Sequence, residues 1–200
     1  MVSPEIEDVV LDATRDCVLA YGVRRTTVSD VARRAGVSRM SIYRRWPDVR
    51  SLVADLMSRE WHGVLVGTAT AHQGRGTVRR STVAQIVAVA AALRAHPLLR
   101  KIREVDPEVL LPYVLDRRGA SHDEMLAFLV DAIRAGQRDG SVRRGNPQRM
   151  SRAMLLMAQS FVLSSALVAD AYSDAELDTE LGTLLDRYLA PAVRESARRD

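Results

Sequence analysis

The chain has 200 residues, of which 47% are apolar, and this composition excludes a disordered polypeptide because it can supply a hydrophobic core. Its formal net charge of +4 comes from 29 basic and 25 acidic residues. A single cysteine, Cys17, excludes an intramolecular disulfide and a cysteine-based zinc site. The four histidines include no pair at the spacing that would place two metal ligands on one helix face, so we expect no metal and no cofactor.

Charge is distributed unevenly along the chain. Residues 1–21 hold five acidic side chains and one arginine, the opposite of a secretory signal, so we expect a cytoplasmic protein. Residues 22–50 hold eight arginines and two aspartates, a net charge of +6, while the remaining 150 residues are nearly balanced. A compact basic segment ahead of a neutral bulk favours a polyanion-binding head on a separate body, with a solvated arginine-rich face as the alternative.

Helical periodicity runs through the chain, because apolar residues recur at three- and four-residue spacing and strand patterns are almost absent. We therefore predict an all-α protein of about nine helices. The first three are expected over residues 4–21, 27–35 and 38–46. Thr27 and Ser38 can cap the second and third helices, Gly22 and Gly36 can end the first two, and Pro47 closes the third.

The remaining helices are separated by turn residues and by a glycine-containing loop at residues 67–76. They are expected over residues 48–66, 77–95, 97–105, 107–117, 121–136 and 147–171, and between Ser173 and Pro191, where Ser173 and Glu176 have the spacing of a capping box. Residues 153–169 carry no charge, and their length approaches the roughly 20 residues of a bilayer span. Because Gln159 and Ser160 interrupt this stretch, a helix buried in a soluble protein is the favoured interpretation.

The second and third helices, joined by residues 35–38, form a helix-turn-helix pattern. Val28, Val31 and Ala32 can pin the second helix to the first, while Val37 and Ile42 can anchor the turn and the third helix. The opposite surface of the third helix then presents Arg39, Met40, Ser41, Tyr43, Arg44 and Arg45. Short side chains near its start would let the helix enter a major groove, where arginine can make a bidentate contact to guanine.

The segment from Thr26 to Pro47, TTVSDVARRAGVSRMSIYRRWP, resembles the DNA-binding signature of the tetracycline-repressor (TetR) family, and the likeness extends from about Val9 to Leu52. It implies a helix-turn-helix DNA-binding domain over residues 1–47 and a larger helical domain for ligand binding and dimerisation over residues 48–200. It further implies phosphate contacts from Thr27, Ser38, Tyr43 and Arg45, and base contacts from Arg39, Met40, Ser41 and Arg44.

Two positions depart from the pattern of that family. Val49 stands where the family usually has a lysine at the start of the fourth helix, and we expect Arg50 to make that phosphate contact instead. Met40 stands where a small residue is common, and we expect its bulk to restrict the DNA sites that are read. Ile42 and Trp46 are assigned to the core.

The uncharged helix and the last helix can form a dimer surface, because apolar residues lie on more than one face of the uncharged helix. The expected interface residues are Ala153, Leu156, Ser160, Leu163, Leu167, Leu177, Leu181 and Leu184. The resemblance implies that these two helices pair with their copies in a four-helix bundle. A two-fold dimer would hold two recognition helices roughly 34–36 Å apart, one in each of two successive major grooves. The central helix of a monomer is the alternative.

The resemblance also implies a ligand pocket among the middle helices. Its candidate lining residues are Trp61, Leu110, Tyr113, Met125, Phe128, Met157 and Phe161. Cavities lined by methionine and aromatic side chains suit apolar ligands of variable shape, although the same residues are also ordinary core residues.

These observations together predict a DNA-binding transcriptional regulator, most simply a homodimeric repressor that a small, largely apolar effector releases from a palindromic operator. The expected partners are double-stranded DNA, a second copy of the chain and the effector, with no membrane. An activator, a ligand-independent DNA-binding protein of the same fold, and a protein-binding adaptor are the alternatives. An enzyme is disfavoured, because the sequence has no glycine-rich phosphate loop, no paired nucleophile and base, and no metal-ligand cluster.

Overall fold

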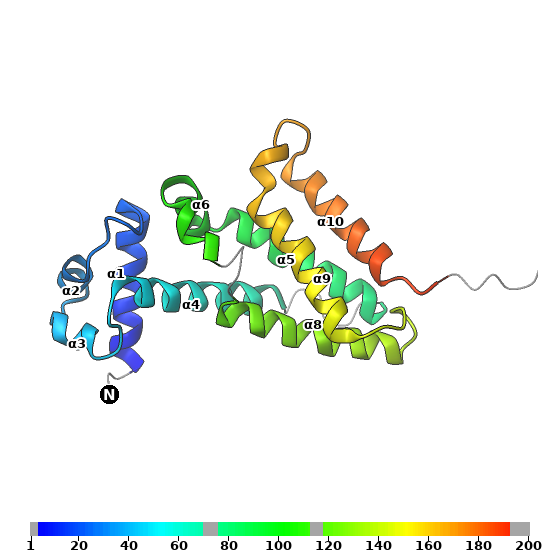
Figure 1. The fold of residues 1–200 in the computed structure, drawn as a ribbon, viewed down its shortest axis with the longest axis horizontal. Coiled ribbons are helices and arrows are strands. Elements are labelled where there is room, and N and C mark those ends of the chain that lie inside the picture. The colour runs from blue at the N-terminus through cyan, green and yellow to red at the C-terminus, as the bar shows by residue number, and fades with distance from the viewer. Residues whose placement is uncertain (1–3, 70–75, 113–117, 193–200) are drawn as a thin grey trace, which may run out of the picture. The chain divides into compact units, whose positions relative to one another are not determined.

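The structure is a computed structural model that describes residues 4–69, 76–112 and 118–192 (Figure 1). The described residues contain helices and no strand, so the all-α prediction is confirmed. The elements are α1 (Pro4–Tyr21), α2 (Val28–Ala35), α3 (Arg39–Tyr43), α4 (Val49–Ala69), α5 (Val78–Ala95), α6 (Pro97–Val105), the 3-10 turn η1 (Pro107–Val109), α8 (Ala120–Arg138), α9 (Pro147–Leu163), the 3-10 turn η2 (Ser165–Val168) and α10 (Asp174–Leu189).

The chain forms two compact units. The first comprises residues 1–64 and 93–121, and the second comprises residues 65–92 and 122–200. Helices α4 and α5 therefore each contribute residues to both units. The predicted division at residue 47 would separate the helix-turn-helix from the rest of the first unit, and it stays a prediction.

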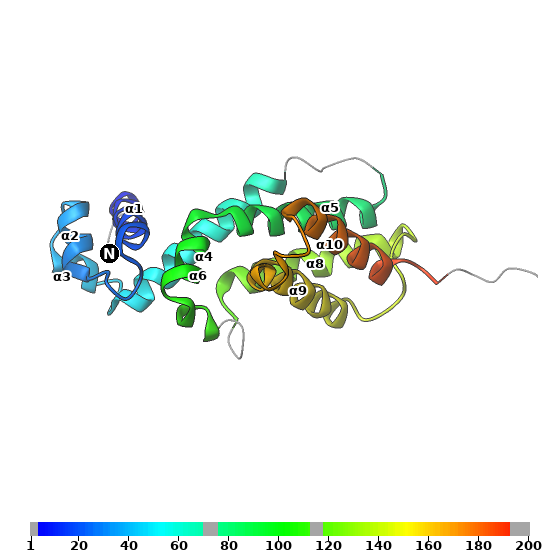
Figure 2. The same ribbon diagram turned by 90° about the horizontal axis from the view of Figure 1, so that it is seen from above.

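The first unit is built on α1, against which α2 and α6 pack, and α3 packs on α2 (Figure 2). Its core is apolar and drawn from all of its helices, with Val18, Val31, Ile42, Trp46, Leu56 and Ile102 among the buried side chains. The assignment of Ile42 and Trp46 to the core is confirmed, and the indole N–H of Trp46 donates to Asp55 Oδ2 at 2.9 Å. Burying such side chains stabilises the unit by about 1.5–3 kcal/mol each.

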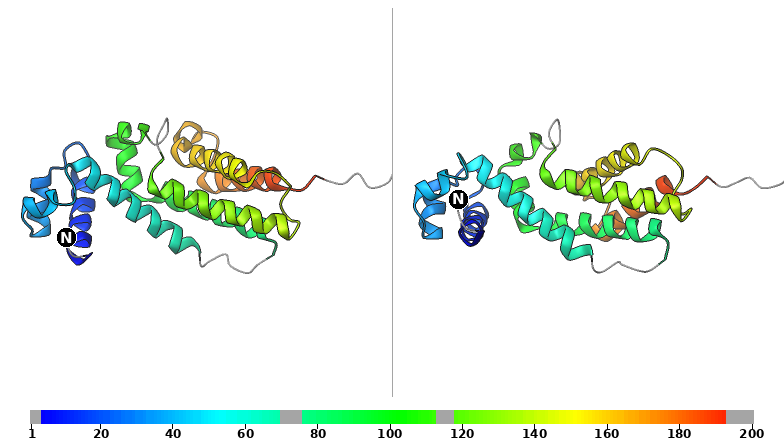
Figure 3. Two further views of the ribbon diagram at one scale, coloured as in Figure 1. Left: turned by 60° about the horizontal axis from the view of Figure 1, so that its bottom comes forward. Right: turned by 90° about the horizontal axis from the view of Figure 1, so that it is seen from below.

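The second unit contains an antiparallel hairpin of α9 and α10, with α5 and α8 running side by side (Figures 1 and 3). Its core includes Leu129, Ile133, Met154, Leu181 and Leu185. The predicted capping box at the start of α10 is present: the Ser173 hydroxyl accepts the Glu176 N–H, and the Glu176 carboxylate accepts the Ser173 N–H.

Helix boundaries agree with the sequence pattern at most turns. Helix α1 spans the predicted residues, and Gly36 ends α2 in the left-handed conformation at φ 68°. Helix α3 is shorter than predicted, because it ends at Tyr43 rather than near Trp46. A proline disfavours helical geometry at the residue that precedes it. Trp46 precedes Pro47, and its side chain is buried in the core.

Two longer helices predicted from the pattern are wrong in extent. The helix expected over residues 147–171 stops at Leu163, and a 3-10 turn follows it. Ser164 and Ser165 lie at this break, where serine hydroxyls can compete with helical backbone bonds. The helix expected over residues 107–117 begins as the 3-10 turn Pro107–Val109, and residues 113–117 lie outside the described residues.

No described helix is by itself long and apolar enough to cross a membrane. The pair α5 and α6, bent at the residue between them, meets that criterion by length and composition alone.

Candidate nucleic-acid interface

Hydrogen bonds fix the start of each helix in the helix-turn-helix. Thr27 Oγ1 accepts the Asp30 N–H at 3.1 Å and donates to Asp30 Oδ2 at 2.6 Å. This bond from Thr27, aided by the charge of Arg33, lowers the pKa of Asp30 below its ordinary value. Ser38 Oγ accepts the Ser41 N–H at 3.1 Å. Both predicted caps are therefore present, and they set the angle at which α3 leaves the turn.

The outer surface of this motif presents the residues predicted to contact DNA. Met40 is 70% exposed, which is high for an apolar side chain. Only Ser41 among the nine predicted residues is half-buried, and its hydroxyl lies 2.9 Å from that of Ser38. The exposed ones are Thr27, Ser38, Arg39, Met40, Tyr43, Arg44, Arg45 and Arg50.

Arginines of the motif differ in whether an acidic side chain compensates them. Arg33 lies 2.7 Å from Asp30, and Arg34 lies 3.0 Å from Asp16. Arg39 and Arg44, by contrast, contact no acidic side chain in the part of the chain that the structure describes. Positive charge without an internal partner therefore gathers on α3 and directly after it.

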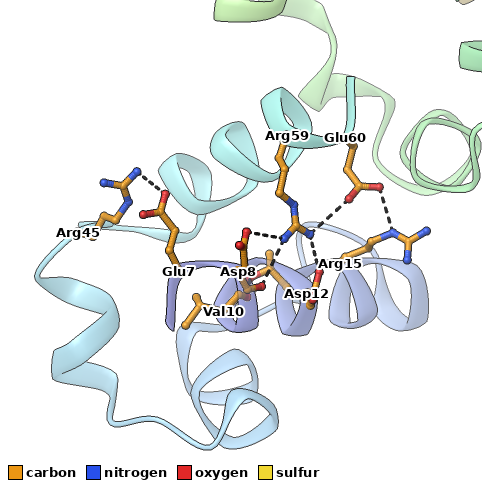
Figure 4. Close-up of polar contacts among 9 residues, drawn as sticks. Glu7, Asp8, Val10, Asp12, Arg15, Arg45, Arg59 and Glu60 are labelled. Atoms are coloured by element: carbon orange, nitrogen blue, oxygen red, sulfur yellow. Dashed lines mark hydrogen bonds and ion pairs between the residues drawn. The ribbon is translucent and has the colours of Figure 1, made fainter. Parts of the chain in front are cut away.

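Arg45 has a different environment from its neighbour. Its guanidinium contacts Glu7 of α1 (Figure 4). It also lies 3.8 Å from Asp55 Oδ2 of α4 and 5.3 Å from the ring centroid of Trp46. A phosphate at this position would have to share the guanidinium with two carboxylates. Its predicted phosphate contact stays a prediction, and the structure adds an intramolecular competitor to it.

A network of ion pairs joins α1 to α4 within the first unit. Arg59 lies 2.7 Å from Asp12 and 3.4 Å from Glu60, and Arg15 Nε lies 3.1 Å from the Glu60 carboxylate (Figure 4). His96 Nε2 lies 3.4 Å from the same Glu60 carboxylate. The Asp12 side chain is 72% exposed, so its pair with Arg59 contributes about 0–1 kcal/mol, whereas the Glu60 side chain at the centre of the network is only 13% exposed.

The second unit contains a cavity of about 80 Å³ that two of the predicted pocket residues line, Met125 and Phe128. The other five lining residues were not predicted from the sequence, and they are Leu65, Gln85, Ile86, Val89 and Glu124. The one feature of the sequence that could have indicated the cavity is Gln85, a polar residue within the apolar pattern of α5. The side-chain amide of Gln85 donates a hydrogen bond to Thr68 Oγ1 at 2.8 Å.

The other predicted pocket residues do not line this cavity. Trp61 and Leu110 belong to the first unit, where Trp61 packs edge-on against His96 at 5.1 Å between ring centroids. Met157 and Phe161 are half-buried on α9 and are not among the lining residues. Tyr113 lies outside the described residues.

The predicted dimer residues divide by exposure. Leu156, Ser160, Leu167 and Leu184 are exposed, and Ala153 and Leu163 are half-buried. Leu177 and Leu181 are instead buried in the core of their own unit, so their assignment to an interface is wrong. Together with Leu185 they lie at four-residue spacing on the inner face of α10. Their side chains are therefore covered by the chain itself and offer no exposed surface to a partner.

Comparison with known proteins agrees with this geometry. Residues 10–56 match the model of the bacterial regulatory proteins of the tetR family. An HTH-type transcriptional regulator of Mycobacterium tuberculosis is 38% identical over 180 residues, covering 90% of this chain and 92% of that protein.

Solved structures share the fold over almost the whole chain. The TetR-family transcriptional repressor QsdR of Rhodococcus erythropolis has a TM-score of 0.67 at 16% identity, covering 94% of this chain and 97% of that chain. A transcriptional regulator from Saccharomonospora viridis, solved in complex with choline, has a TM-score of 0.64 at 14% identity, covering 94% of this chain and 99% of that chain.

Proposed function

The chain belongs to the TetR family of DNA-binding bacterial transcriptional regulators, and from that premise we propose that it is a homodimeric repressor which a small effector releases from a palindromic operator. The observation that carries the proposal is the exposed surface of the helix-turn-helix, where Arg39 and Arg44 have no acidic partner among the described residues and Met40 is 70% exposed. Binding to chromosomal DNA would place the protein in the cytoplasm.

Base reading is proposed for the side chains near the start of α3 and directly after it. Arg39 and Arg44 can donate two hydrogen bonds to guanine, and the exposed thioether of Met40 can pack on a thymine methyl group. Ser41, although half-buried, can reach a base edge if its bond to Ser38 opens. Phosphate contacts are proposed for Thr27, Ser38, Tyr43, Arg45 and Arg50, and they would set the register of α3 on the duplex.

A two-fold dimer is proposed through α9, η2 and α10. Leu156 is 67% exposed and Leu167 is 82% exposed. Leaving this much aliphatic surface in contact with water is unfavourable in free energy. Leu184 and Ser160 are exposed on the same hairpin. Covering these leucines with a second copy would remove that cost and would hold two recognition helices on one operator.

Effector binding is proposed at the cavity lined by α4, α5 and α8 of the second unit. Five of its seven lining residues are apolar, and its volume of about 80 Å³ suits a small group rather than a whole drug-sized molecule. A neighbour of the same fold was solved with choline, which supports a small-molecule effector here. Helix α4 contains both Leu65 of the cavity wall and Leu56 of the first unit's core. A ligand that shifts α4 would therefore change the equilibrium between orientations of the helix-turn-helix.

Selection of the purified protein on random duplex DNA tests the proposal. An inverted repeat with half-sites about one helical turn apart is expected, because two heads related by a two-fold axis read the same sequence twice. Enrichment of one isolated half-site would contradict the dimer, and no enrichment by a folded protein would contradict sequence reading and favour the adaptor. The double variant Arg39→Ala, Arg44→Ala should fail to enrich any site, while a matched control, Arg138→Ala and Arg144→Ala in the second unit, should select the wild-type sequence.

A further inference from the structure

A buried carboxylate connects α6 to the turn that precedes the helix-turn-helix. Asp106 follows the last residue of α6, and its Oδ2 accepts the backbone N–H of Val23 at 2.6 Å. The Asp106 side chain belongs to the interior, because the residue is 2% exposed. Both residues belong to the first unit, although 83 positions separate them in the sequence.

The turn is shaped to admit this carboxylate. Gly22 has a φ of 85°, and a Cβ atom there would stand 2.5 Å from Asp106 Oδ2 and 2.9 Å from Val105 Cγ1. The glycine therefore serves two purposes: it adopts a left-handed conformation, and it leaves room for the side chain of Asp106. A side chain at position 22 would force the side chains of Asp106 and Val105 to shift, and the left-handed backbone there would be strained.

Burial of the carboxylate is compensated locally. The Val23 N–H supplies a hydrogen bond, and Arg24 Nε lies 4.0 Å from Asp106 Oδ1. Arg24 is largely exposed and also lies 3.3 Å from the exposed Glu108, so its contact contributes little by itself. The bond to the backbone is the stronger anchor, because a carboxylate accepts a hydrogen bond more strongly than a neutral acceptor does.

Hydrogen bonds lead from this anchor to the start of α2. The Thr26 hydroxyl donates to the Gly22 carbonyl at 2.7 Å, and the Thr26 N–H donates to the Val23 carbonyl at 3.1 Å. Thr27 follows directly and caps α2. On the other side, α6 is held by Leu98 and Ile102, both fully buried. The turn is therefore fixed between a packed helix and the first residue of the DNA-reading motif.

We infer that Asp106 is a positioning residue for operator recognition: by holding the Val23 amide, it sets the orientation of the helix-turn-helix against α6. It need not touch DNA. In a two-headed protein the orientation of each head determines which separation of half-sites both can reach, so Asp106 acts on the choice of half-site spacing. The inference rests on the proposed function, because spacing has meaning only for a dimer on a repeated site.

The test compares affinity for the selected operator with affinity for one whose half-sites are moved apart by two base pairs. Wild-type protein should prefer the selected spacing. Asp106→Ala should relax this preference by about tenfold, the effect of losing one charge-assisted hydrogen bond, while affinity for an isolated half-site stays unchanged. Asp106→Asn keeps an oxygen acceptor and should fall between the two. Glu108→Gln, which also changes the surroundings of Arg24 but leaves the Val23 bond intact, should behave as wild type.

The outcomes separate the two proposals. A wild-type protein that selects no repeated site contradicts the proposed function itself. A wild-type protein with a clear spacing preference that Asp106→Ala retains, when circular dichroism shows the variant folded, overturns the positioning role alone. If Asp106→Ala does not fold, Asp106→Asn decides, because its neutral acceptor should still relax the preference by about threefold, and an unchanged preference overturns the inference.

Discussion

At the scale of single residues, Arg44 and Arg45 are adjacent in sequence but differ in whether acidic side chains contact their guanidinium groups. Arg44 is exposed with no acidic partner among the described residues, whereas Arg45 contacts Glu7 and Asp55. Sequence pattern assigned both to the DNA face, because that assignment needs only the local helix-turn-helix. It could not reveal the partners of Arg45, which come from α1 and α4 and meet it only in the folded chain.

Arg44→Ala should lower affinity for the selected operator by roughly 1–3 kcal/mol, because it removes a proposed bidentate base contact. Affinity for a scrambled duplex should fall much less, since base contacts carry sequence information and phosphate contacts do not. Fluorescence anisotropy at fixed salt measures both. Arg138→Ala removes the same charge from the second unit and controls for net charge. Equal losses on operator and scrambled DNA would exclude Arg44 from base reading.

Glu7→Gln should strengthen DNA binding severalfold, because it removes a carboxylate that competes with phosphate for Arg45. The magnitude of the salt slope should rise by up to about 0.9, the contribution of one additional neutralised phosphate. Titrations over a range of salt concentrations measure the slope. Glu5→Gln is the matched control, with the same charge change on the same helix and no contact to Arg45. If both variants bind equally well, only net charge matters and Arg45 makes no phosphate contact.

At the scale of elements, helices and their caps followed from local chemistry, whereas their faces did not. Thr27, Ser38, Gly36 and the Ser173 capping box lie where the pattern put them, because caps depend on residues within one turn. The two faces of α10 were confused, since Leu181 and Leu184 are equally apolar and only the packed structure separates inner from outer. The sequence predicts only two of the seven residues that line the cavity, because the lining comes from three helices and periodicity along one helix does not show which helices it packs against.

The junction between α5 and α6 carries a prediction about pH. His96 packs against Trp61 and faces Glu60 and Arg15, and burial, outweighing the attraction of Glu60, lowers the pKa of its imidazole below the ordinary 6.5. The unfolded chain therefore binds a proton at His96 more readily than the folded chain does. Stability from this group is present above about pH 6.5 and is lost as the pH falls towards the folded pKa.

His96→Gln should remove the pH-dependent contribution of His96 to stability. The free energy of unfolding of the variant should therefore fall less than that of the wild type between neutral and mildly acidic pH. Denaturant titrations at several pH values measure the difference. Parallel pH curves for wild type and His96→Gln would contradict a role for His96 in acid sensitivity.

At the scale of the whole molecule, the proposed regulator needs two heads on one operator, and its affinity should depend on dimer formation more than on any single contact. Leu156 and Leu167 are the exposed aliphatic residues whose burial would drive association. Replacing Leu156 with glutamate places a charge where a partner's apolar surface would lie, and an unpaired charge buried at an interface costs several kcal/mol.

Leu156→Glu should therefore sediment as a monomer at concentrations where the wild type is a dimer, and its operator affinity should fall to that of an isolated half-site. Leu111→Glu is the matched control, because Leu111 is a comparably exposed leucine at 51% that belongs to the first unit and is not part of the α9–α10 hairpin. Half-site affinity should be the same in both variants, since neither touches the helix-turn-helix. A dimeric Leu156→Glu protein with full operator affinity would locate the interface elsewhere, and loss of half-site affinity as well would indicate damage to the fold rather than to the dimer.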